Sequence, residues 1–432
     1  MNQQNKQGLL ALSPILLLIL LMVGFSLYYH DFYKVPLVIL FIITSAAALL
    51  TLRKKSFNER INIFSKGAAQ SDLMLMIWIF VLAGAFASGA KEMGAVEATV
   101  NLTLHILPSE MLLPGIFIAA CLVSLSIGTS VGTIAALVPI VVGLSTKTGM
   151  SCEMLTAATV GGAFFGDNLS FISDTTVVAT KTQGCKMSDK FKTNFLIALP
   201  AAITTIILYV IIGESCNTNI VAQGNISYVK IIPYLAVLGS AIAGLNVLLV
   251  LPIGIILTGV IGLCTSSMEF STWLSSMTIG ISSMSETILI ALLAGGMLMV
   301  IRTGGGIDWI IRRLIRHSNN RKSAELSIAV LVSATNLCTA NNTVAILSVG
   351  SIAKDISQKF NIDPKRTASI LDTFSCFVQG IIPYGAQLLI ASGLSQVAAT
   401  SLMPYLYYPY ILGAFALISI LTGFPETKKR VL

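Results

Sequence analysis

Two aspartates stand in a stretch of the chain, residues 154–180, that carries no other charged side chain. Asp167 and Asp174 belong to the string 166–176, Gly-Asp-Asn-Leu-Ser-Phe-Ile-Ser-Asp-Thr-Thr. Their spacing of seven returns both to one face if the segment is helical throughout. A carboxylate in apolar surroundings is costly unless it binds a cation or a proton. The pair could therefore exchange Na⁺ for H⁺, although Asp174 could instead only cap the helix that follows it.

Hydroxyl and amide oxygens accompany these acids, both beside them and in a second polar segment. That segment, 128–133, reads Gly-Thr-Ser-Val-Gly-Thr and lies between two apolar runs. Hydroxyls and freed backbone carbonyls are ligands for a hard cation, so we predict Na⁺ binding at Ser130, Thr133 and Asp167. The other expected ion ligands are Asp174, Thr129, Asn168, Ser173 and Thr175. The alternative is an ordinary polar loop at a helix end.

The second half of the chain has polar residues at matching positions. The segment 339–343, Thr-Ala-Asn-Asn-Thr, aligns with 129–133 at an offset of 210, and Gln379 stands where the first half has Asp167. The N-terminus of a helix that follows this segment would favour an anion or carboxylate. If a solute is carried, the residues expected to contact it are Asn341, Asn342, Thr343, Gln379, Gln387 and Asp372. Asp372 could equally serve in capping or in pairing between helices.

The composition indicates where these residues must be held. Of 432 residues, 55% are hydrophobic and 11% are charged, against roughly 25% charged in typical soluble domains. The mean hydropathy is +0.85, and apolar runs of about 17–25 residues, long enough to cross a bilayer as helices, recur along the chain. We therefore predict an all-α polytopic protein of the lipid bilayer and exclude a water-soluble enzyme. Helices are expected near 9–28, 34–52, 72–90, 152–180 and 194–213.

The chain also resembles a duplication. Short matches recur at offsets of 210 to 212, which places the two halves at 1–214 and 215–432. We expect about five crossings and one re-entrant hairpin in each half, the hairpins at 111–146 and about 323–354. The glycines near Asp167, together with Pro383 in the second half, predict broken helices at about 152–180 and 366–396.

The basic residues favour this topology. With a cytoplasmic N-terminus, all but four of the 27 Lys and Arg residues fall on the cytoplasmic side, as the positive-inside rule requires. The exceptions are Lys34, Lys91, Lys147 and Lys230, and the cytoplasmic clusters lie at 53–66, 181–192, 302–322, 354–366 and 428–430. Reading both hairpins as single crossings would place the 354–366 cluster outside. Both termini are thus predicted to be cytoplasmic, and the net charge of +8 needs no nucleic-acid partner.

An odd number of crossings in each half makes the second half inverted relative to the first. Inverted repeats whose broken helices meet near the membrane midplane are typical of secondary transporters. No Walker A or hydrolase motif occurs where it could act, so we expect neither an enzyme nor a cofactor, only transported or coupling ions. A channel is the alternative class, but sealed hairpins and the lack of an acidic ring argue against it.

At 128–133 and 166–176 the sequence resembles the NhaC-type Na⁺/H⁺ antiporter family of the ion-transporter superfamily. The resemblance implies exchange of Na⁺ for H⁺, a bacterial inner (plasma) membrane location, elevator-type movement and a homodimer. Some relatives carry an organic acid or an amino-acid-like solute, which leaves a solute transporter as the second hypothesis. The family's tip motif carries over onto Ser130, Thr133, Asn341, Asn342 and Thr343, and its acids onto Asp167 and Asp174. Where the family often has His-Cys-Ser-Pro after Gly-Asp, this chain has Asn-Leu-Ser-Phe at 168–171.

Overall fold

The structure is a computed structural model that describes residues 3–29, 37–171, 173–215, 227–243, 245–315 and 320–425. The predicted cytoplasmic cluster at 428–430 and Lys34 lie outside the described residues. Every regular element in the described part is a helix, as the composition predicts.

The helices fall into two groups, before and after the gap at residues 216–226. The first half contains α1 (Gln3–Tyr29), α2 (Leu37–Thr51), α3 (Phe57–Ala68), α4 (Ser71–Glu92), α5 (Ala95–Ile106), η2 (Ser109–Met111), α6 (Leu112–Ile127), α7 (Ser130–Thr148), α8 (Cys152–Leu169), α9 (Asp174–Gln183) and α10 (Met187–Ser215). The second half contains α11 (Tyr228–Ile242), α12 (Val247–Cys264), α13 (Phe270–Ser283), α14 (Ser285–Thr303), α15 (Gly306–Ile315), α16 (Arg321–Thr339), α17 (Asn342–Lys359), α18 (Pro364–Gln379), α19 (Ala386–Ser395), α20 (Ala399–Leu402), η3 (Met403–Tyr405) and α21 (Tyr407–Thr422).

Many of these helices are apolar enough to lie in a membrane. Within the described residues, five stretches are long and apolar enough to cross it, and a sixth forms if the bent pair Ala386–Ser395 and Ala399–Tyr405, at 102°, is counted as one span. The five are Leu73–Glu92, Ser130–Thr148, Met187–Gly213, Val247–Cys264 and Phe270–Thr303. Shorter apolar helices include Leu37–Thr51, Leu112–Ile127 and Tyr407–Thr422. The chain is a multi-pass membrane protein.

Two of the helix breaks share one backbone geometry. Between α6 and α7, Gly128 is left-handed (φ 73°) and Thr129 is extended (φ −142°). Between α16 and α17, Ala340 is left-handed (φ 50°) and Asn341 is extended (φ −146°). Glycine adopts the left-handed conformation readily, whereas alanine does so at an energetic cost that the surrounding structure must offset. Among the described residues, no side chain caps the N-terminus of α7 at the first break, whereas Asn341 caps that of α17 at the second.

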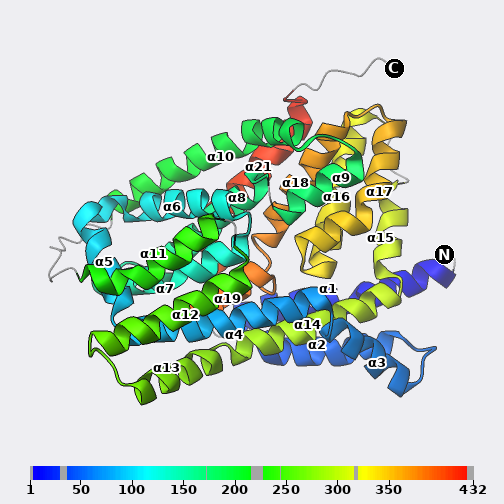
Figure 1. The fold of residues 1–432 in the computed structure, drawn as a ribbon. Helices are drawn as coiled ribbons and strands as arrows, with labels where there is room; N and C mark the ends of the chain where they lie inside the picture. Colours follow the sequence, from blue (N-terminus) through cyan, green and yellow to red (C-terminus); the bar gives the residue numbers. More distant parts are fainter. Residues whose placement is uncertain are drawn as a thin grey trace.

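The broken helices bring the two halves together around a shared centre. The helix that follows each of their breaks packs on a helix from the other part of the sequence, α9 against α17 and α19 against α7. Below this centre in Figure 1, the long helices α4, α12, α13 and α14 form a layer, with α4 packed on both α12 and α13. Glycines allow the closest approach: a Cβ on Gly166 of α8 would collide with Ser124 and the backbone of Leu125 in α6.

The structure corrects several expectations about helix boundaries. The final helix of the first half, α10, begins at Met187 and not near 194, so Lys190 lies on a helix instead of in a cytoplasmic loop, and it is buried. Arg366, counted in the cytoplasmic cluster at 354–366, is buried as well. The short helices α3 and α5 were not predicted. Lys190 and Arg366 therefore say nothing about which side of the membrane faces the cytoplasm.

Candidate functional site: a polar cavity between the two halves

A cavity of about 300 Å³ opens where the helix breaks of both halves converge. Its polar lining comes from the α6–α7 break, the end of α8 and start of α9, the α16–α17 break, and the α18–α19 break. The predicted site residues that line it are Thr129, Ser130, Asp167, Asp174, Thr175, Asn341, Asn342, Thr343, Gln379 and Gln387. Arg302 at the end of α14 and Gln70 before α4 add polar groups from the layer of long helices.

Asp167 lies in the last turn of α8, and its side chain is 5% exposed. Its Oδ1 accepts a hydrogen bond from the hydroxyl of Ser173 at 2.6 Å, and its Oδ2 accepts one from Ser130 at 3.0 Å. The amide of Asn342 lies 3.4 Å from the same Oδ2. The carboxylate thus contacts three separate breaks in the helices, two from its own half and one from the other, and all its donors are uncharged.

Two glutamines of the second half extend this network. Gln387 donates to the Ser130 hydroxyl at 3.0 Å, and Gln379 donates to Gln387 Oε1 at 2.9 Å and to the carbonyl of Ala340 at 3.0 Å. Gln379 Oε1 is buried without a hydrogen-bond partner among the described groups. A buried acceptor with no donor usually marks a place where a water, an ion or a ligand binds. Gln379 lines the cavity, so its unpaired Oε1 is a further oxygen that a bound ion or solute could use.

The polar residues at the α16–α17 break, Asn341, Asn342 and Thr343, have different roles. Asn341 Oδ1 accepts from the backbone N–H of Val344 at 3.0 Å, which makes Asn341 the N-cap of α17. Asn342 faces Asp167 with its Nδ2 while its Oδ1 accepts from the Thr343 N–H at 3.1 Å. Of the three residues, Asn342 alone contacts the carboxylate directly.

Thr133, Asp174 and Thr175 make no described hydrogen bond to the Asp167 carboxylate, although Asp174 and Thr175 line the cavity. The hydroxyl of Thr133 is buried and donates to the carbonyl of Thr129 in its own helix at 3.0 Å, and Thr133 does not line the cavity. Asp174 is the exposed first residue of α9, and Ser173 takes the N-cap position. A continuous helix would place Asp167 and Asp174 on one face. The helix instead breaks between α8 and α9, so the two acids do not share a face. Thr175 reaches Asp167 only through Ser173, at 2.9 Å.

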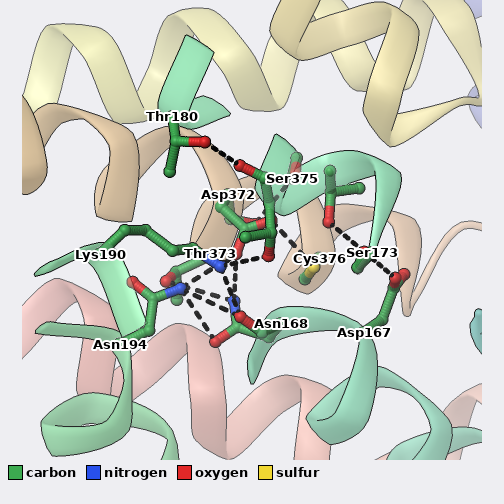
Figure 2. A network of polar contacts seen from close by, with 12 residues as sticks. Asp167, Asn168, Ser173, Thr180, Lys190, Asn194, Asp372, Thr373, Ser375 and Cys376 are labelled. Atoms are coloured by element: carbon green, nitrogen blue, oxygen red, sulfur yellow. Dashed lines mark hydrogen bonds and ion pairs between the residues drawn. The ribbon is translucent and has the colours of Figure 1, made fainter. Parts of the chain in front are cut away.

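Asn168 and Asp372 belong to a second buried network beside the cavity (Figure 2). Asp372 Oδ2 forms an ion pair with Lys190 Nζ at 2.5 Å and accepts from Asn194 at 3.0 Å and from Asn168 at 3.2 Å. Lys190 and Asp372 are 1% and 0% exposed. Asp372 thus pairs between helices, which was one of the two roles expected for it, and neither it nor Asn168 lines the cavity. Thr373 Oγ1 also lies 3.4 Å from the Asn168 amide.

Lys190 and Asn194 were not predicted as site residues because the predicted helix began too late. A helix beginning near 194 leaves both in a loop or at its edge, but their spacing of four places them on one face once α10 is extended to Met187. A lysine one turn before an asparagine on an otherwise apolar helix face predicts a buried polar contact. With the correct start of α10, the sequence would have predicted this buried pair.

The chain is similar in sequence to known proteins. The sequence model of the Na⁺/H⁺ antiporter family matches the chain twice, over residues 8–214 and 217–424. The chain is 25% identical to the Na(+)/H(+) antiporter NhaC of Bacillus subtilis (strain 168), over 98% of this chain and 99% of that protein. It is 18% identical to the malate-2H(+)/Na(+)-lactate antiporter of the same organism, over 81% of each chain.

A solved structure is also similar. The crystal structure of the Alcanivorax borkumensis YdaH transporter superposes with a TM-score of 0.42 and 13% identity, covering 85% of this chain and 89% of that one. The family match extends over nearly all of the sequence. The chain belongs to the Na⁺/H⁺ antiporter family.

Proposed function

We propose that this protein exchanges Na⁺ for H⁺ across the membrane and that both ions bind at Asp167. One observation carries the proposal. Three acids are buried among the described residues, and two of them have a basic partner: Glu325 pairs with Arg366, and Asp372 pairs with Lys190. Asp167 forms no ion pair with any described Lys or Arg. A buried carboxylate without a cation must acquire one or be protonated, and these are the two states that exchange requires.

The neighbouring groups suit both states. When Na⁺ is bound, Ser130 and Ser173 can turn their hydroxyl oxygens toward the ion, since a hydroxyl can accept as well as donate. When a proton is bound, the carboxyl group has become neutral and the same hydroxyls satisfy its oxygens. The exchange needs no cofactor beyond the transported ions.

The test is Na⁺-driven proton movement in proteoliposomes. Asp167→Asn removes the charge but keeps the size, so we expect it to abolish exchange, while Asp355→Asn on the exposed face of α17 should leave the rate unchanged. Thermal unfolding of the purified variants establishes that both are folded. Exchange that persists in folded Asp167→Asn would refute the assignment of Asp167.

The proposal also includes the orientation of the two halves in the membrane and their movement during transport. Two family matches in one chain support two repeats, and the charge pattern supports their inversion and cytoplasmic termini in a bacterial inner membrane. The centre formed by α6–α9 and α16–α19 would move as an elevator against the layer that contains α4 and α14. A Cβ at Gly393 of α19 would lie 2.9 Å from Thr287 Oγ1 of α14, so a disulfide between cysteines at these two positions should stop transport until it is reduced. Full transport by the cross-linked protein would contradict the movement.

We also propose the homodimer that the family resemblance implies. It predicts two chains per particle when the mass is measured in detergent.

A solute is the second candidate cargo because the cavity is larger than Na⁺ requires. Amide and hydroxyl groups of Asn342, Thr343 and Gln387 line it, and Arg302 could pair with a carboxylate. The relative named as a malate and lactate antiporter shows that such cargo occurs among similar chains. Saturable, Na⁺-dependent binding of labelled malate, lactate or amino acids would support this candidate. No saturable binding alongside Na⁺/H⁺ exchange would exclude it.

A further inference from the structure

The ammonium group of Lys190 lies inside a cluster of oxygen atoms (Figure 2). Its Nζ is 2.5 Å from Asp372 Oδ2, 2.6 Å from the backbone carbonyl of Asn168 and 2.7 Å from the hydroxyl of Thr176. The side chains of Lys190, Asp372 and Thr176 are all at least 98% buried. The charge is therefore held entirely by protein oxygens.

These three atoms are the kinds of ligand that bind a hard monovalent cation. They are a carboxylate, a backbone carbonyl and a hydroxyl, and no soft ligand stands among them. The Asn168 carbonyl lies in the last turn of α8, where the helix dipole adds partial negative charge. Thr176 belongs to α9 and Asp372 to α18, so the ligands come from the break that holds Asp167 and from the opposite half.

Asn194, which donates to the same carboxylate as Lys190, also has an oxygen without a donor. Asn194 Oδ1 is buried and has no hydrogen-bond partner among the described groups, while Asn194 Nδ2 donates to Asp372 and to Asn168. An ammonium offers three donors, and all three have acceptors here. A metal ion has no fixed donor directions, so it could bind a fourth oxygen, such as Asn194 Oδ1, in addition to these three.

We propose that this cluster is a second cation site whose permanent occupant is the ammonium of Lys190, and that it binds an alkali cation such as Na⁺ when that side chain is removed. The site differs from Asp167, and its existence does not depend on exchange at Asp167. In the intact protein the tethered charge balances Asp372 permanently. One acid, Asp167, is thereby left to take an exchangeable ion.

The experiment counts bound Na⁺ ions in the purified protein by equilibrium dialysis with radiolabelled Na⁺. Lys190→Ala removes the ammonium and leaves room for an ion with water, so we expect one more bound Na⁺ per chain than in the wild type. Lys190→Ala combined with Asp372→Asn removes the negative charge as well and should lose that additional ion. Lys181→Ala, at an exposed position on α9, is the matched control and should bind as the wild type does.

The same count in an Asp167→Asn background separates this proposal from the exchange mechanism. If Asp167 holds the exchangeable ion, Asp167→Asn binds none, whereas Asp167→Asn with Lys190→Ala binds one. An additional ion in Lys190→Ala supports the cation site even if wild-type protein shows no exchange. A folded Lys190→Ala protein that binds no additional Na⁺ would overturn the proposal and leave the ion pair as a structural brace.

Folding is measured for each variant by thermal unfolding in NaCl and in choline chloride. Lys190→Ala should gain more stability from Na⁺ than the wild type does, because ion binding stabilises the folded state. Lys190→Ser is the second variant, since its hydroxyl adds an oxygen while leaving the space open. If neither variant folds even in high Na⁺, the alkali ion cannot replace the ammonium and the proposal is refuted.

Discussion

The hydroxyl of Ser130 donates to the carboxylate of Asp167 at 3.0 Å and accepts from the amide of Gln387 at 3.0 Å. Ser130 is the first residue of α7 and Gln387 lies in the first turn of α19. One side chain therefore connects the tip of the first hairpin, the acid at the end of α8 and the broken helix of the second half. Binding or loss of a cation at Asp167 would therefore act on a hydroxyl that is also bonded to Gln387.

The first prediction concerns pH. If Na⁺ and H⁺ compete for the Asp167 carboxylate, protonation at low pH removes the Na⁺ site, so the apparent KM for Na⁺ must rise as the pH falls. In the range where the carboxyl group is mostly protonated, competition by one proton raises this KM about tenfold for each pH unit. Initial rates of Na⁺ uptake at several pH values measure the slope. A KM that does not change with pH would argue for separate Na⁺ and H⁺ sites.

The second prediction compares two hydroxyls of α7. Ser130→Ala removes a contact to the Asp167 carboxylate, and a hydrogen bond to a charged group contributes about 1.5–3 kcal/mol. We expect the affinity for Na⁺ to fall about tenfold or more. Thr133→Val keeps the shape and removes a hydroxyl that bonds only to its own helix, so its effect should be below about threefold. Equal losses in the two variants would restore Thr133 as an ion ligand.

The third prediction separates two adjacent asparagines. Asn342→Ala removes the donor to Asp167 and should lower the affinity for Na⁺ while leaving thermal stability nearly unchanged. Asn341→Ala removes the N-cap of α17 and should cost about 1 kcal/mol of stability, with a smaller change in affinity. Na⁺ binding and unfolding midpoints are measured for both proteins. The opposite pattern would mean that Asn341 contacts the cargo.

The fourth prediction concerns the ion pair of Arg366 and Glu325, at 3.0 Å and with 1% and 3% of their side chains exposed. Glu325→Gln leaves a buried guanidinium without its carboxylate, which should destabilise the fold by roughly 3–5 kcal/mol. Adding Arg366→Met removes the unpaired charge and should recover much of that loss. Unfolding midpoints of the single and double variants measure the difference. A double variant that is less stable than Glu325→Gln would show that the contacts of Arg366 with Ser419 outweigh the unpaired charge.

The sequence alone determined the helical membrane class and the polar segments of the cavity. These follow from local chemistry: long apolar runs must form helices in lipid, and a glycine-rich polar string within such a run must line a site or be covered. Asp167 stood out because a lone acid in an apolar stretch is costly to bury and is rare outside functional positions. Ser130 and Asn342 belong to the two polar segments that match at an offset of 210, and Gln387 stands where the first half has Thr175; the structure places all three on the same cavity.

Only the tertiary structure decided which of these residues meet. Thr133 and Ser130 belong to one motif, yet the turn at Gly128 directs Ser130 toward Asp167 while Thr133 bonds within its own helix. The partner of Asp372 lies 182 positions earlier in the chain, at Lys190, which the charge pattern places in the cytoplasm. Spacing along a chain predicts contacts within one helix. Contacts between helices depend on how the helices pack, and this packing determined that two buried acids are paired while Asp167 has no basic partner among the described residues.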